Sequence, residues 1–420
     1  MGTEKIAILH YTAPPVIGGV EAVIKAHAQL LTEAHYQVTI MSGRGEKIAL
    51  PKGTNLIQIP EVGSQFPEIM TMNAQLEKGE VPKNFNTMVT HITSTLAPIL
   101  KTFNHLIVHN IFTKHFNLPL TAALHQLLDN KTIAHCIAWC HDFTWSSPHS
   151  KSKVHPGYPW ELLRTYREDV TYVTVSERRK RTLIQLLGCQ GENIETIHNG
   201  VDPVTLLGLS EQGHMLISRM GLLDADLILL MPVRVTQAKN VEYTLQVTAA
   251  LKSQNCQVKL ILTGPPDPHD EKSMAYFESL KALRKQLQLD NNMHFVFESG
   301  PDPKQPYTIN ARVVGDLFRV SDVMFMPSHR EGFGMPVLEA GLVGIPIICT
   351  NMPAAEEIGK GNVLTFNTQD DPNVVATRII KLLNASPVHS LRQKVRKNYT
   401  WQAIFNQKIY PLLEERESAS

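Results

Sequence analysis

Two glutamates of this sequence, Glu331 and Glu339, lie with seven residues between them in a stretch that could bind a ligand. The apolar run Val323–Pro327 comes just before and predicts a buried strand. Glycines beside Glu331 let a ligand approach the backbone, because no Cβ stands in the way. Pro336 suits the first position of a helix, and a helix start offers unpaired N–H groups and a positive dipole to an anion. The stretch Ser328–Glu339 therefore predicts a site for a negatively charged, hydroxyl-rich ligand.

A pair of cations follows another strand-like run. The apolar run Leu227–Val233 predicts the first strand of a second sheet, and a helix is expected at Val241–Leu251. Arg234 and Lys239 lie in the loop between them, with four residues separating the two. Arginine offers a bidentate fork and lysine a mobile point charge, so this loop could hold a phosphate group. In a doubly wound fold the pair and Ser328–Glu339 would leave the same sheet edge. A solvated loop is the alternative interpretation.

A glycine-containing loop near the N-terminus is a third candidate. Lys5–His10 and Gln37–Ser42 are apolar runs typical of covered parallel strands, and a helical pattern of apolar residues lies between them. Gly18 and Gly19 stand in the loop after the first strand, where α/β folds bind ligands. The loop is not the Gly-x-Gly-x-x-Gly dinucleotide fingerprint, which argues against an oxidoreductase. A tight strand–helix turn that requires glycine is the alternative.

Strand-like and helix-like segments alternate along the chain, which predicts an α/β protein with doubly wound parallel sheets. Further strands are expected at Asn55–Pro60, His105–Asn110, Thr132–His141, Tyr172–Val175, Asn193–Ile197, Val258–Gly264, His294–Glu298, Ile345–Thr350 and Val363–Phe366. Further helices are expected at Phe85–Phe103, Leu118–Leu128, Glu271–Leu289, Ala311–Val320, Pro336–Leu342 and Asn373–Asn384. The segment between Pro60 and Phe85 contains Pro67, Gly79 and Pro82, and we expect it to be irregular.

Turn-forming residues at His198–Pro203 predict a boundary between two domains. We expect an N-terminal domain at residues 1–205 and a C-terminal domain at residues 206–400. The glycine- and serine-containing segment Gly208–Gly213 is interpreted as the linker. The final helix, expected at residues 401–416, is predicted to pack back on the first domain.

A long loop, residues 143–167, follows the strand that ends at His141. Loops of this length at the end of a strand are usually functional or disordered. This one is rich in aromatic side chains, which suit sugar rings, and in cations, which suit a carboxylate or phosphate. The candidates for contact with an anionic sugar are Trp145, Lys151, Lys153 and Arg164. Packing of an extra helix on the domain is the alternative.

The composition excludes several classes of protein. The chain has 420 residues, of which 43% are hydrophobic and 19% charged, as is typical of folded globular domains. A net charge of +1 does not favour nucleic acid or an anionic membrane, and the basic run Arg178–Arg181 is interpreted as a solvated helix face. No apolar run is long enough to span a membrane, and the first residues lead into a strand without a signal peptide. Five scattered cysteines indicate a reduced, cytoplasmic protein.

Together these motifs resemble the family 4 glycosyltransferases, retaining enzymes of the GT-B fold with two facing Rossmann-like domains and a cleft between them. The resemblance covers nearly the whole chain and is strongest from Asn199 to Gly359. Its hallmarks are the Glu-x7-Glu motif (Glu331, Glu339), the Arg-x4-Lys pair (Arg234, Lys239), Asn199-Gly200-Val201-Asp202 and Gly18-Gly19-Val20-Glu21. No single motif is specific for this family, but the four motifs together at this spacing are.

The resemblance implies how a nucleotide-sugar donor would be held. Arg234 and Lys239 would hold the diphosphate and neutralise its charge as it leaves. Glu339 would accept hydrogen bonds from the ribose hydroxyls, and Glu331 would contact the transferred sugar. Further donor contacts are implied at Gly18, Gly19, Gly332, Phe333, Gly334, Met335, Pro336, Val337, Phe297 and Asn199.

Other implications of the resemblance concern the reaction. His141 matches a family histidine near the transferred sugar, and a core histidine at the end of a strand is the alternative. The turn Phe297–Gly300, where the base would lie, departs from the family's usual sequence, so no base is implied. Without an obvious carboxylate nucleophile, retention would proceed by front-face attack through an oxocarbenium-like state. No cofactor and no metal are expected, because arginine and lysine supply the positive charge.

The function expected from the sequence is that of a hexosyltransferase. The donor would be a nucleotide-diphosphate sugar of the UDP-glucose or GDP-mannose type, and the acceptor a soluble, small or glycan molecule, in the sharper form an anionic one. A lipid- or polysaccharide-directed glycosyltransferase, a sugar phosphorylase or synthase on the same fold, and a regulatory nucleotide-sugar-binding protein are the alternatives. Peripheral membrane contact and the oligomeric state are left open.

Overall fold

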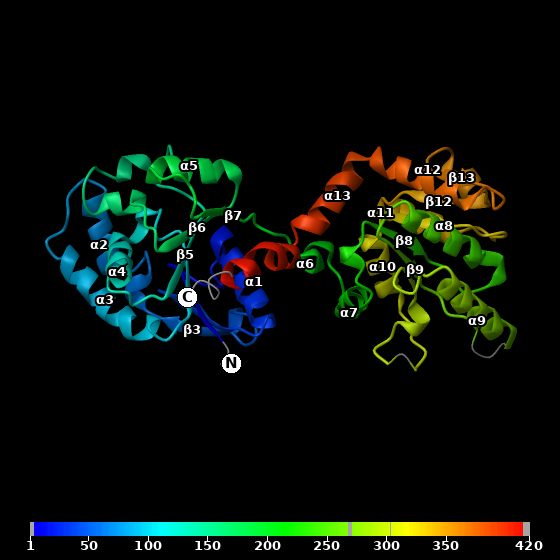
Figure 1. Ribbon diagram of the computed structural model, residues 1–420, viewed down its shortest axis with the longest axis horizontal. Coiled ribbons are helices and arrows are strands. Elements are labelled where there is room, and N and C mark those ends of the chain that lie inside the picture. Colours follow the sequence, from blue (N-terminus) through cyan, green and yellow to red (C-terminus); the bar gives the residue numbers. More distant parts are fainter. Residues whose placement is uncertain (1–3, 268–270, 303, 415–420) are drawn as a thin grey trace. The chain divides into compact units, whose positions relative to one another are not determined.

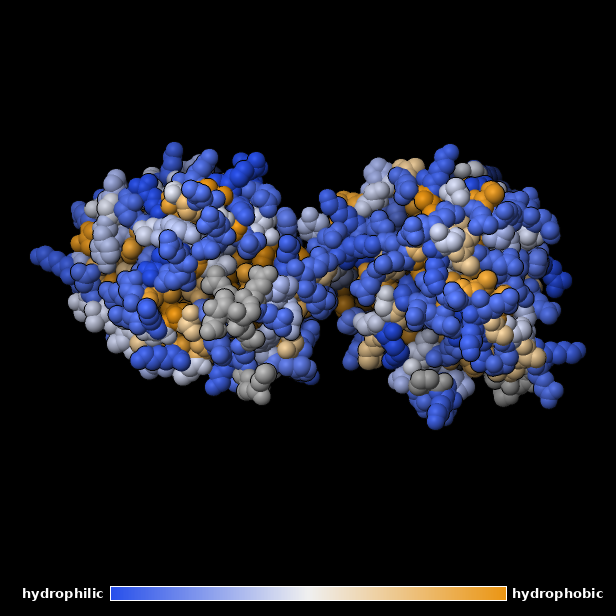
Figure 2. All heavy atoms as spheres, in the orientation of Figure 1, coloured by the Kyte–Doolittle hydropathy of each residue, from blue (hydrophilic) through white to orange (hydrophobic). Residues whose placement is uncertain are grey.

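The computed structural model describes residues 4–267, 271–302 and 304–414 (Figure 1). The chain divides into two compact units. Unit 1 holds the described residues up to Gly200 together with those from Trp401 onward, and unit 2 holds Val201–Thr400. Hydrophilic residues cover most of the face shown in Figure 2, on both units.

Unit 1 is built on a parallel sheet whose described strands follow the order β3-β2-β1-β4-β5-β6-β7. The strands are β1 (Lys5–Leu9), β2 (Gln37–Ser42), β3 (Asn55–Gln58), β4 (His105–His109), β5 (His135–Cys140), β6 (Val170–Thr174) and β7 (Ile194–Thr196). Alternate residues of β1 point to opposite faces, so that Ile6 and Ile8 enter one hydrophobic core and Ala7 and Leu9 another. Helices cover both faces, which explains why the strands read as apolar runs.

The two faces of the unit 1 sheet are covered by different parts of the chain. One face carries α1 (Gly19–Glu33) and the C-terminal α14 (Trp401–Ile404), a π-helical turn at Phe405–Ile409 and α15 (Tyr410–Glu414). Figure 1 shows these C-terminal helices beside α1. The other helices of unit 1 are α2 (Pro67–Leu76), α3 (Phe85–Leu100), α4 (Leu118–Asp129) and α5 (Glu177–Leu187).

Unit 2 repeats the plan with a parallel sheet of order β10-β9-β8-β11-β12-β13 among the described strands. The strands are β8 (Leu227–Met231), β9 (Val258–Leu262), β10 (Met293–Phe295), β11 (Val323–Met326), β12 (Ile347–Thr350) and β13 (Leu364–Phe366). The helices are α6 (Pro203–Leu207), α7 (Glu211–Arg219), α8 (Val241–Ser253), α9 (Glu271–Gln286), α10 (Ala311–Val320), α11 (Met335–Val343), α12 (Pro372–Asn384) and α13 (Pro387–Asn398). The fold class expected from the sequence, two Rossmann-like α/β domains, is confirmed.

A buried ion pair ties α13 to the sheet of unit 2. The Arg396 guanidinium donates to both carboxylate oxygens of Asp322, over 3.0 and 2.9 Å. Asp322 also accepts the backbone N–H of Ile228 in β8 at 2.9 Å. Arg396 further donates to the carbonyls of Ala225 and Asp226, 3.0 Å away in each case. The pair therefore fixes the beginnings of β8 and β11 against α13.

The chain leaves unit 1 at Gly200 and returns at Trp401. A Cβ on Gly200 would lie 2.8 Å from the backbone nitrogen of Trp401, so only glycine fits there. Immediately afterwards, Val201 forms a parallel bridge with Thr400 inside unit 2. Unit 2 is therefore an insertion into unit 1, entered and left at adjacent points.

Each strand expected from the sequence is present, but the one expected at His294–Glu298 is shorter, because Val296–Glu298 forms a 3-10 helix. Two other expectations are wrong. The segment between Pro60 and Phe85 is not irregular throughout, because α2 forms there and buries Ile69, Met72 and Leu76. The segment Gly208–Gly213 is not a linker, because α7 begins at Glu211. Ser210 caps that helix, and a side chain on Gly213 would collide with Asp316 of α10. The glycine in this segment serves close helix packing.

Candidate functional site

The centre of the candidate site in unit 2 is a contact between Lys239 and Glu331. The Lys239 Nζ lies 2.6 Å from the Glu331 Oε1, and the Ser328 hydroxyl donates to the same oxygen at 2.7 Å. The two side chains are 21% and 10% exposed, so the pair is shielded but reachable from solvent. The structure thus brings together one residue from each of the two motifs that the sequence analysis singled out.

The two loops that carry this pair are themselves joined. They follow β8 and β11, which are neighbours in the sheet. The backbone N–H of His329 donates to the carbonyl of Ala238 at 2.9 Å. The Thr350 hydroxyl at the end of β12 donates to the carbonyl of Ser328 at 2.6 Å. These hydrogen bonds to backbone groups therefore hold the two loops together, so that Lys239 and Glu331 meet at the sheet edge where α/β folds bind ligands.

Arg234 and Glu339 are exposed at the same part of unit 2. Arg234 lies in the loop after β8, three positions beyond the last residue of that strand. A Cβ on Gly264 would lie 2.7 Å from the Arg234 Cα, so glycine lets the loop after β9 pack closely against the loop after β8. Glu339 lies in the first turns of α11. Neither side chain has an ion pair or hydrogen bond within the ranges that the structure describes. Both are therefore available to a ligand.

The turn between the two glutamates has one position that needs glycine. Gly334 has a φ of 95° and precedes α11, and a Cβ there would lie 3.0 Å from the Met352 Sδ. Gly332 has open space around its Cα and an ordinary backbone conformation. Phe333 and Met335 are exposed, whereas Val337 is buried in the core. Pro336 is the second residue of α11, one position later in the helix than expected.

Two more expected donor-binding residues occupy different surroundings. Phe297 is buried, and its ring packs edge-on against Phe277 with centroids 5.6 Å apart. Any contact of Phe297 itself with a base would therefore come mainly from its backbone groups. Asn199 is exposed in unit 1, directly before the chain leaves that unit.

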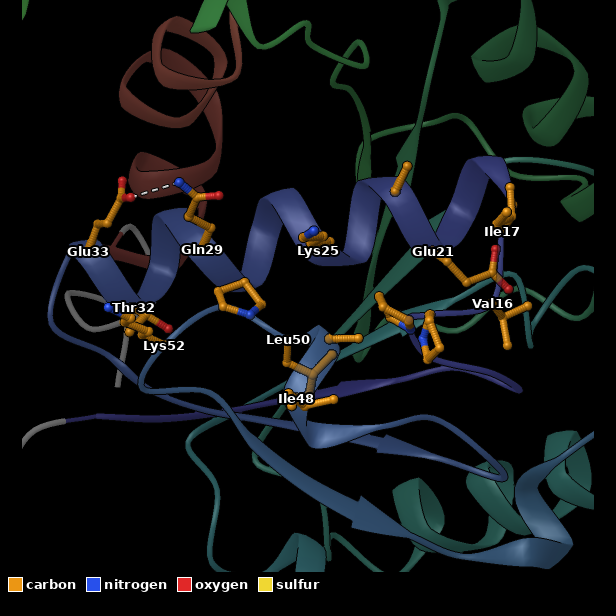
Figure 3. Close-up of a pocket in the computed structure, with 16 residues that line it drawn as sticks. Val16, Ile17, Glu21, Lys25, Gln29, Thr32, Glu33, Ile48, Leu50 and Lys52 are labelled. Carbon is orange, nitrogen blue, oxygen red and sulfur yellow. Dashed lines mark hydrogen bonds between the residues drawn. The ribbon is translucent and has the colours of Figure 1, made fainter. Parts of the chain in front are cut away.

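In unit 1, the loop with Gly18 forms one wall of a pocket of about 750 Å³ (Figure 3). Figure 3 shows Glu21 at the start of α1 beside Val16 and Ile17 of this loop. The Glu21 carboxylate accepts a hydrogen bond from the Thr12 hydroxyl, and a side chain on Gly18 would collide with Glu21. A side chain at position 18 would thus force the Glu21 carboxylate to move, whereas Gly19 has open space. Their contact with a diphosphate stays a prediction.

His141 belongs to a group of buried histidines at the ends of β1, β4 and β5. Its Nε2 lies 3.0 Å from the Nδ1 of His109, and the two rings are stacked. Burial, reinforced by the proximity of His10, lowers the pKa of His141 to about 4, and burial lowers the pKa of His27 to about 3. The pKa of His109 is likewise well below its usual value. At neutral pH His141 is therefore an uncharged imidazole that can donate or accept a hydrogen bond.

Matches to known proteins cover both units. Residues 219–400 match the family described as "Glycosyl transferases group 1", and residues 17–204 match "Glycosyltransferase Family 4". The chain belongs to glycosyltransferase family 4. The two matched ranges together contain all four motifs on which the resemblance rested.

Individual relatives are distant. The chain is 24% identical over 257 residues to the uncharacterized glycosyltransferase MJ1607 of Methanocaldococcus jannaschii, covering 59% of this chain and 61% of the relative. It is 21% identical over 290 residues to mannosylglucosylglycerate synthase of Petrotoga mobilis, covering 64% of each chain. The matches thus span less than two thirds of both relatives. A solved structure of Anabaena HepE with UDP and glucose is 17% identical, with a TM-score of 0.37 over 98% of this chain and 100% of that one.

The loop at residues 143–167 of this family 4 glycosyltransferase uses most of its expected acceptor residues internally. Lys153 pairs with Glu77 at 2.9 Å. Arg164 pairs with Glu161 at 2.6 Å and stacks 4.1 Å above the ring of Trp145. The Trp145 indole N–H donates to the Trp160 carbonyl at 3.2 Å. Lys151 is exposed without such a contact in the described parts of the chain.

Three cations that the sequence analysis did not assign to the glycosyltransferase site lie together in unit 1. Lys114, Arg178 and Arg179 line a second pocket. Lys114 follows β4, and the arginines open α5, so 63 positions separate Lys114 from Arg178 in the sequence. The sequence offered one signal of this group, because Lys114 follows the strand expected at His105–Asn110, where α/β folds bind ligands.

Within the described residues, no group of three or more histidine, cysteine or acidic side chains is arranged to hold a metal ion. The sequence contains two carboxylates with one residue between them, Asp224 and Asp226. Here Asp226 pairs with Lys397 and accepts the backbone N–H of Gln257 at 2.8 Å. It lies before β8, at the opposite end of that strand from Lys239. None of the described helices has both the length and the apolar character needed to span a membrane.

Proposed function

We propose that the protein is a retaining hexosyltransferase that uses a nucleotide-diphosphate sugar, of the UDP-glucose or GDP-mannose type. The observation that carries this proposal is the contact between Lys239 and Glu331, 2.6 Å apart at the ligand-binding edge of unit 2. It joins a cation suited to a phosphate with a carboxylate suited to sugar hydroxyls. The exposed side chains of Arg234 and Glu339 complete the set.

The pair can couple the leaving group to the transferred sugar. A lysine ammonium has three N–H donors, so Lys239 can keep Glu331 and still donate to a phosphate oxygen. As the donor bond breaks, negative charge accumulates on the diphosphate, and Arg234 and Lys239 would stabilise it. Glu331 would meanwhile accept hydrogen bonds from the hexosyl group, and Glu339 from the ribose. Backbone N–H groups at the start of α11 would add donors for the phosphate.

Retention would follow from attack on the same face that the diphosphate leaves. In this scheme an oxocarbenium-like state forms, and a departing phosphate oxygen takes the proton of the acceptor hydroxyl. Arginine and lysine would supply the positive charge, so the reaction would need no metal or cofactor. His141, as a neutral imidazole, would contribute a hydrogen bond to the transferred sugar and no charge.

For the acceptor we propose a soluble, small and acidic molecule. The cations at the carboxyl edge of the unit 1 sheet support this, since an arginine fork or an ammonium binds a carboxylate or phosphate. The similar protein of Petrotoga mobilis is named for a product that contains glycerate, a carboxylic acid. Action in the cytoplasm fits five free cysteines among the described residues.

The donor can be found by measuring thermal unfolding with UDP-, GDP- and ADP-sugars in turn. A ligand that binds only the native state raises the unfolding temperature. The sugar that stabilises most should be hydrolysed slowly without acceptor, and Glu331→Gln should abolish this turnover. Glu278→Gln, at an exposed position of α9, is the matched control and should retain the turnover.

The products separate this proposal from its alternatives. NMR of the glycoside should show the anomeric configuration of the donor, and inversion would contradict the retaining assignment. Phosphate-dependent cleavage of a disaccharide would indicate a phosphorylase instead. A wild-type protein that binds the donor and never turns it over would indicate a regulatory protein. Transfer to lipid acceptors alone would replace the soluble acceptor with a membrane-borne one.

A further inference from the structure

A second pocket of unit 1, of about 490 Å³, lies at the carboxyl ends of β4, β5 and β6. Lys114 reaches it from the segment after β4, Asp142 from the segment after β5, and Arg178 and Arg179 from α5, which follows β6. The hydroxyls of Ser146 and Ser147 line it as well. Asp142 follows His141 directly in the chain, so the pocket adjoins the histidine expected near the transferred sugar.

Lys114 is an unusual cation for a surface pocket. Its residue is only 9% exposed, and its ammonium has no hydrogen-bond or carboxylate partner among the residues that the structure describes. The contact that it does make is with the ring of Phe116, whose centroid is 4.7 Å from its Nζ. Burial lowers the pKa of Lys114, with Asp142 opposing this effect. A largely buried cation that makes no direct contact with a carboxylate costs free energy, which an anionic ligand would recover.

The pocket as a whole carries an excess of positive charge. Its lining contains three cations, Lys114, Arg178 and Arg179, and one carboxylate, Asp142, which leaves a net charge of +2. Arg179 pairs with Asp142 at 2.7 Å, whereas Arg178 has no described ion pair. The first turn of α5 adds the positive end of a helix dipole. A phosphate monoester carries a charge of roughly −1.5 to −2 at neutral pH, which matches this excess.

We propose that this pocket binds a phosphate monoester group of the acceptor, held by Lys114, Arg178 and Arg179. The inference rests on the proposed function, since it assigns the acceptor's chemistry. It also changes the interpretation of the basic run Arg178–Arg181, which was expected to be a solvated helix face. Only the first two residues of that run line the pocket, and Lys180 and Arg181 do not.

Phosphate binding is measured without any nucleotide sugar. The binding test can therefore fail while donor turnover succeeds, or succeed while donor turnover fails. Inorganic phosphate is titrated into the full chain by calorimetry, at constant ionic strength. Lys114→Met and Arg178→Gln should each weaken phosphate binding by about tenfold or more, because each removes a charge-assisted hydrogen bond. Arg181→Gln, from the same helix turn, should leave it unchanged. Arg178 is exposed, so its variant keeps the test valid even if Lys114→Met does not fold.

Three results of the binding experiment would overturn the inference. The wild type could fail to bind phosphate, or both pocket variants could bind as the wild type does. Alternatively, Arg234→Gln could abolish the binding, which would assign it to unit 2. Transfer assays with hexoses and their 6-phosphates then distinguish an acceptor phosphate from free phosphate. The phosphorylated member should be preferred about tenfold in kcat/KM, and the preference should disappear in Arg178→Gln. Equal use of both members by the wild type would show that the pocket does not read the acceptor.

Discussion

The two units share one plan, a parallel sheet with polar loops at its carboxyl edge, but they place charge differently. Unit 2 contains a preformed ion pair at the edge, Lys239–Glu331, and another in the core, Asp322–Arg396. In unit 1 the titratable side chains among the buried polar residues are mostly histidines, and Lys114 at the rim makes no direct ion pair with the described residues. The difference teaches that one topology can offer preformed ion pairs on one sheet and an uncompensated positive pocket on another.

Acid should separate the two units most strongly. Burial lowers the pKa of six histidines in unit 1, against two in unit 2; they are His10, His27, His109, His115, His125 and His141, against His294 and His389. Between the unfolded pKa of about 6.5 and the lower folded values, the unfolded chain binds more protons, so stability falls as pH falls. Each fully buried histidine contributes up to about 1.4 kcal/mol per pH unit. Unit 1 should therefore lose several such contributions below pH 6.5 and unfold first.

The chain supplies its own reporter for this experiment. All four tryptophans, Trp139, Trp145, Trp160 and Trp401, belong to unit 1, so tryptophan fluorescence follows that unit while circular dichroism follows both. The ring nitrogens of His27 have no hydrogen-bond partner among the described residues, so His27→Phe should fold and lower the acid midpoint. His91→Phe, at an exposed site, should not. Coincident acid transitions by both signals would break the comparison.

Removing the buried cation of unit 2 should have the next largest effect. Arg396→Met leaves Asp322 buried without its partner, which should destabilise unit 2 by about 3–5 kcal/mol. Chemical denaturation followed by circular dichroism measures this loss, while the fluorescence transition of unit 1 should stay in place. The exposed Arg312→Met is the control and should change stability by less than about 0.5 kcal/mol. If Arg396→Met shifted the fluorescence transition together with the circular-dichroism transition, the two units would unfold together.

The edge pair of unit 2 is expected to matter for turnover more than for folding. Lys239→Met should lower the rate of nucleotide-sugar turnover about 10²–10³-fold, because it removes a charge from the developing diphosphate. Lys239→Met also leaves Glu331 without its partner, which should lower thermal stability. The double variant Lys239→Met/Glu331→Gln should recover that stability but not the rate of turnover. Steady-state kinetics and thermal unfolding measure the two effects separately. Wild-type rates in Lys239→Met would remove the main support for the proposed function.

The smallest effect concerns the turn before α11. Gly334→Ala should destabilise unit 2 by about 1–2 kcal/mol, because alanine is strained at a positive φ and would also press on Met352. Gly332→Ala, two residues earlier, meets open space and should be close to neutral for stability. Thermal unfolding of both variants tests this. Equal effects would mean that the turn rearranges freely.

Much of the fold could be predicted because its signals are local. Apolar runs such as Leu227–Val233 are strands wherever helices cover both faces of a sheet, and each expected strand is present. The helix α2 was missed because Pro67 begins it, in a segment that also contains turn-forming residues. Gly213 was misread because glycine marks a loop in sequence, whereas here it permits contact with Asp316 from a helix about 100 residues away.

Side-chain partners explain why the site was harder to predict than the fold. Lys153 was expected to contact the acceptor, but it pairs with Glu77, which no local pattern connects to it. Lys114 was overlooked because a single lysine in a loop carries no motif. Lys239 and Glu331 were recognised because each belongs to a spaced pair whose loops leave neighbouring strands, and strand order places such loops together.

The junction at Gly200 and Trp401 also sets an order of synthesis. The hydrophobic core on one face of the unit 1 sheet includes Ile404 and Phe405, which the ribosome makes only after all of unit 2. Domains generally fold as units while the chain is being made. Unit 2 can therefore finish folding on the ribosome while unit 1, begun earlier, still waits for its last helices.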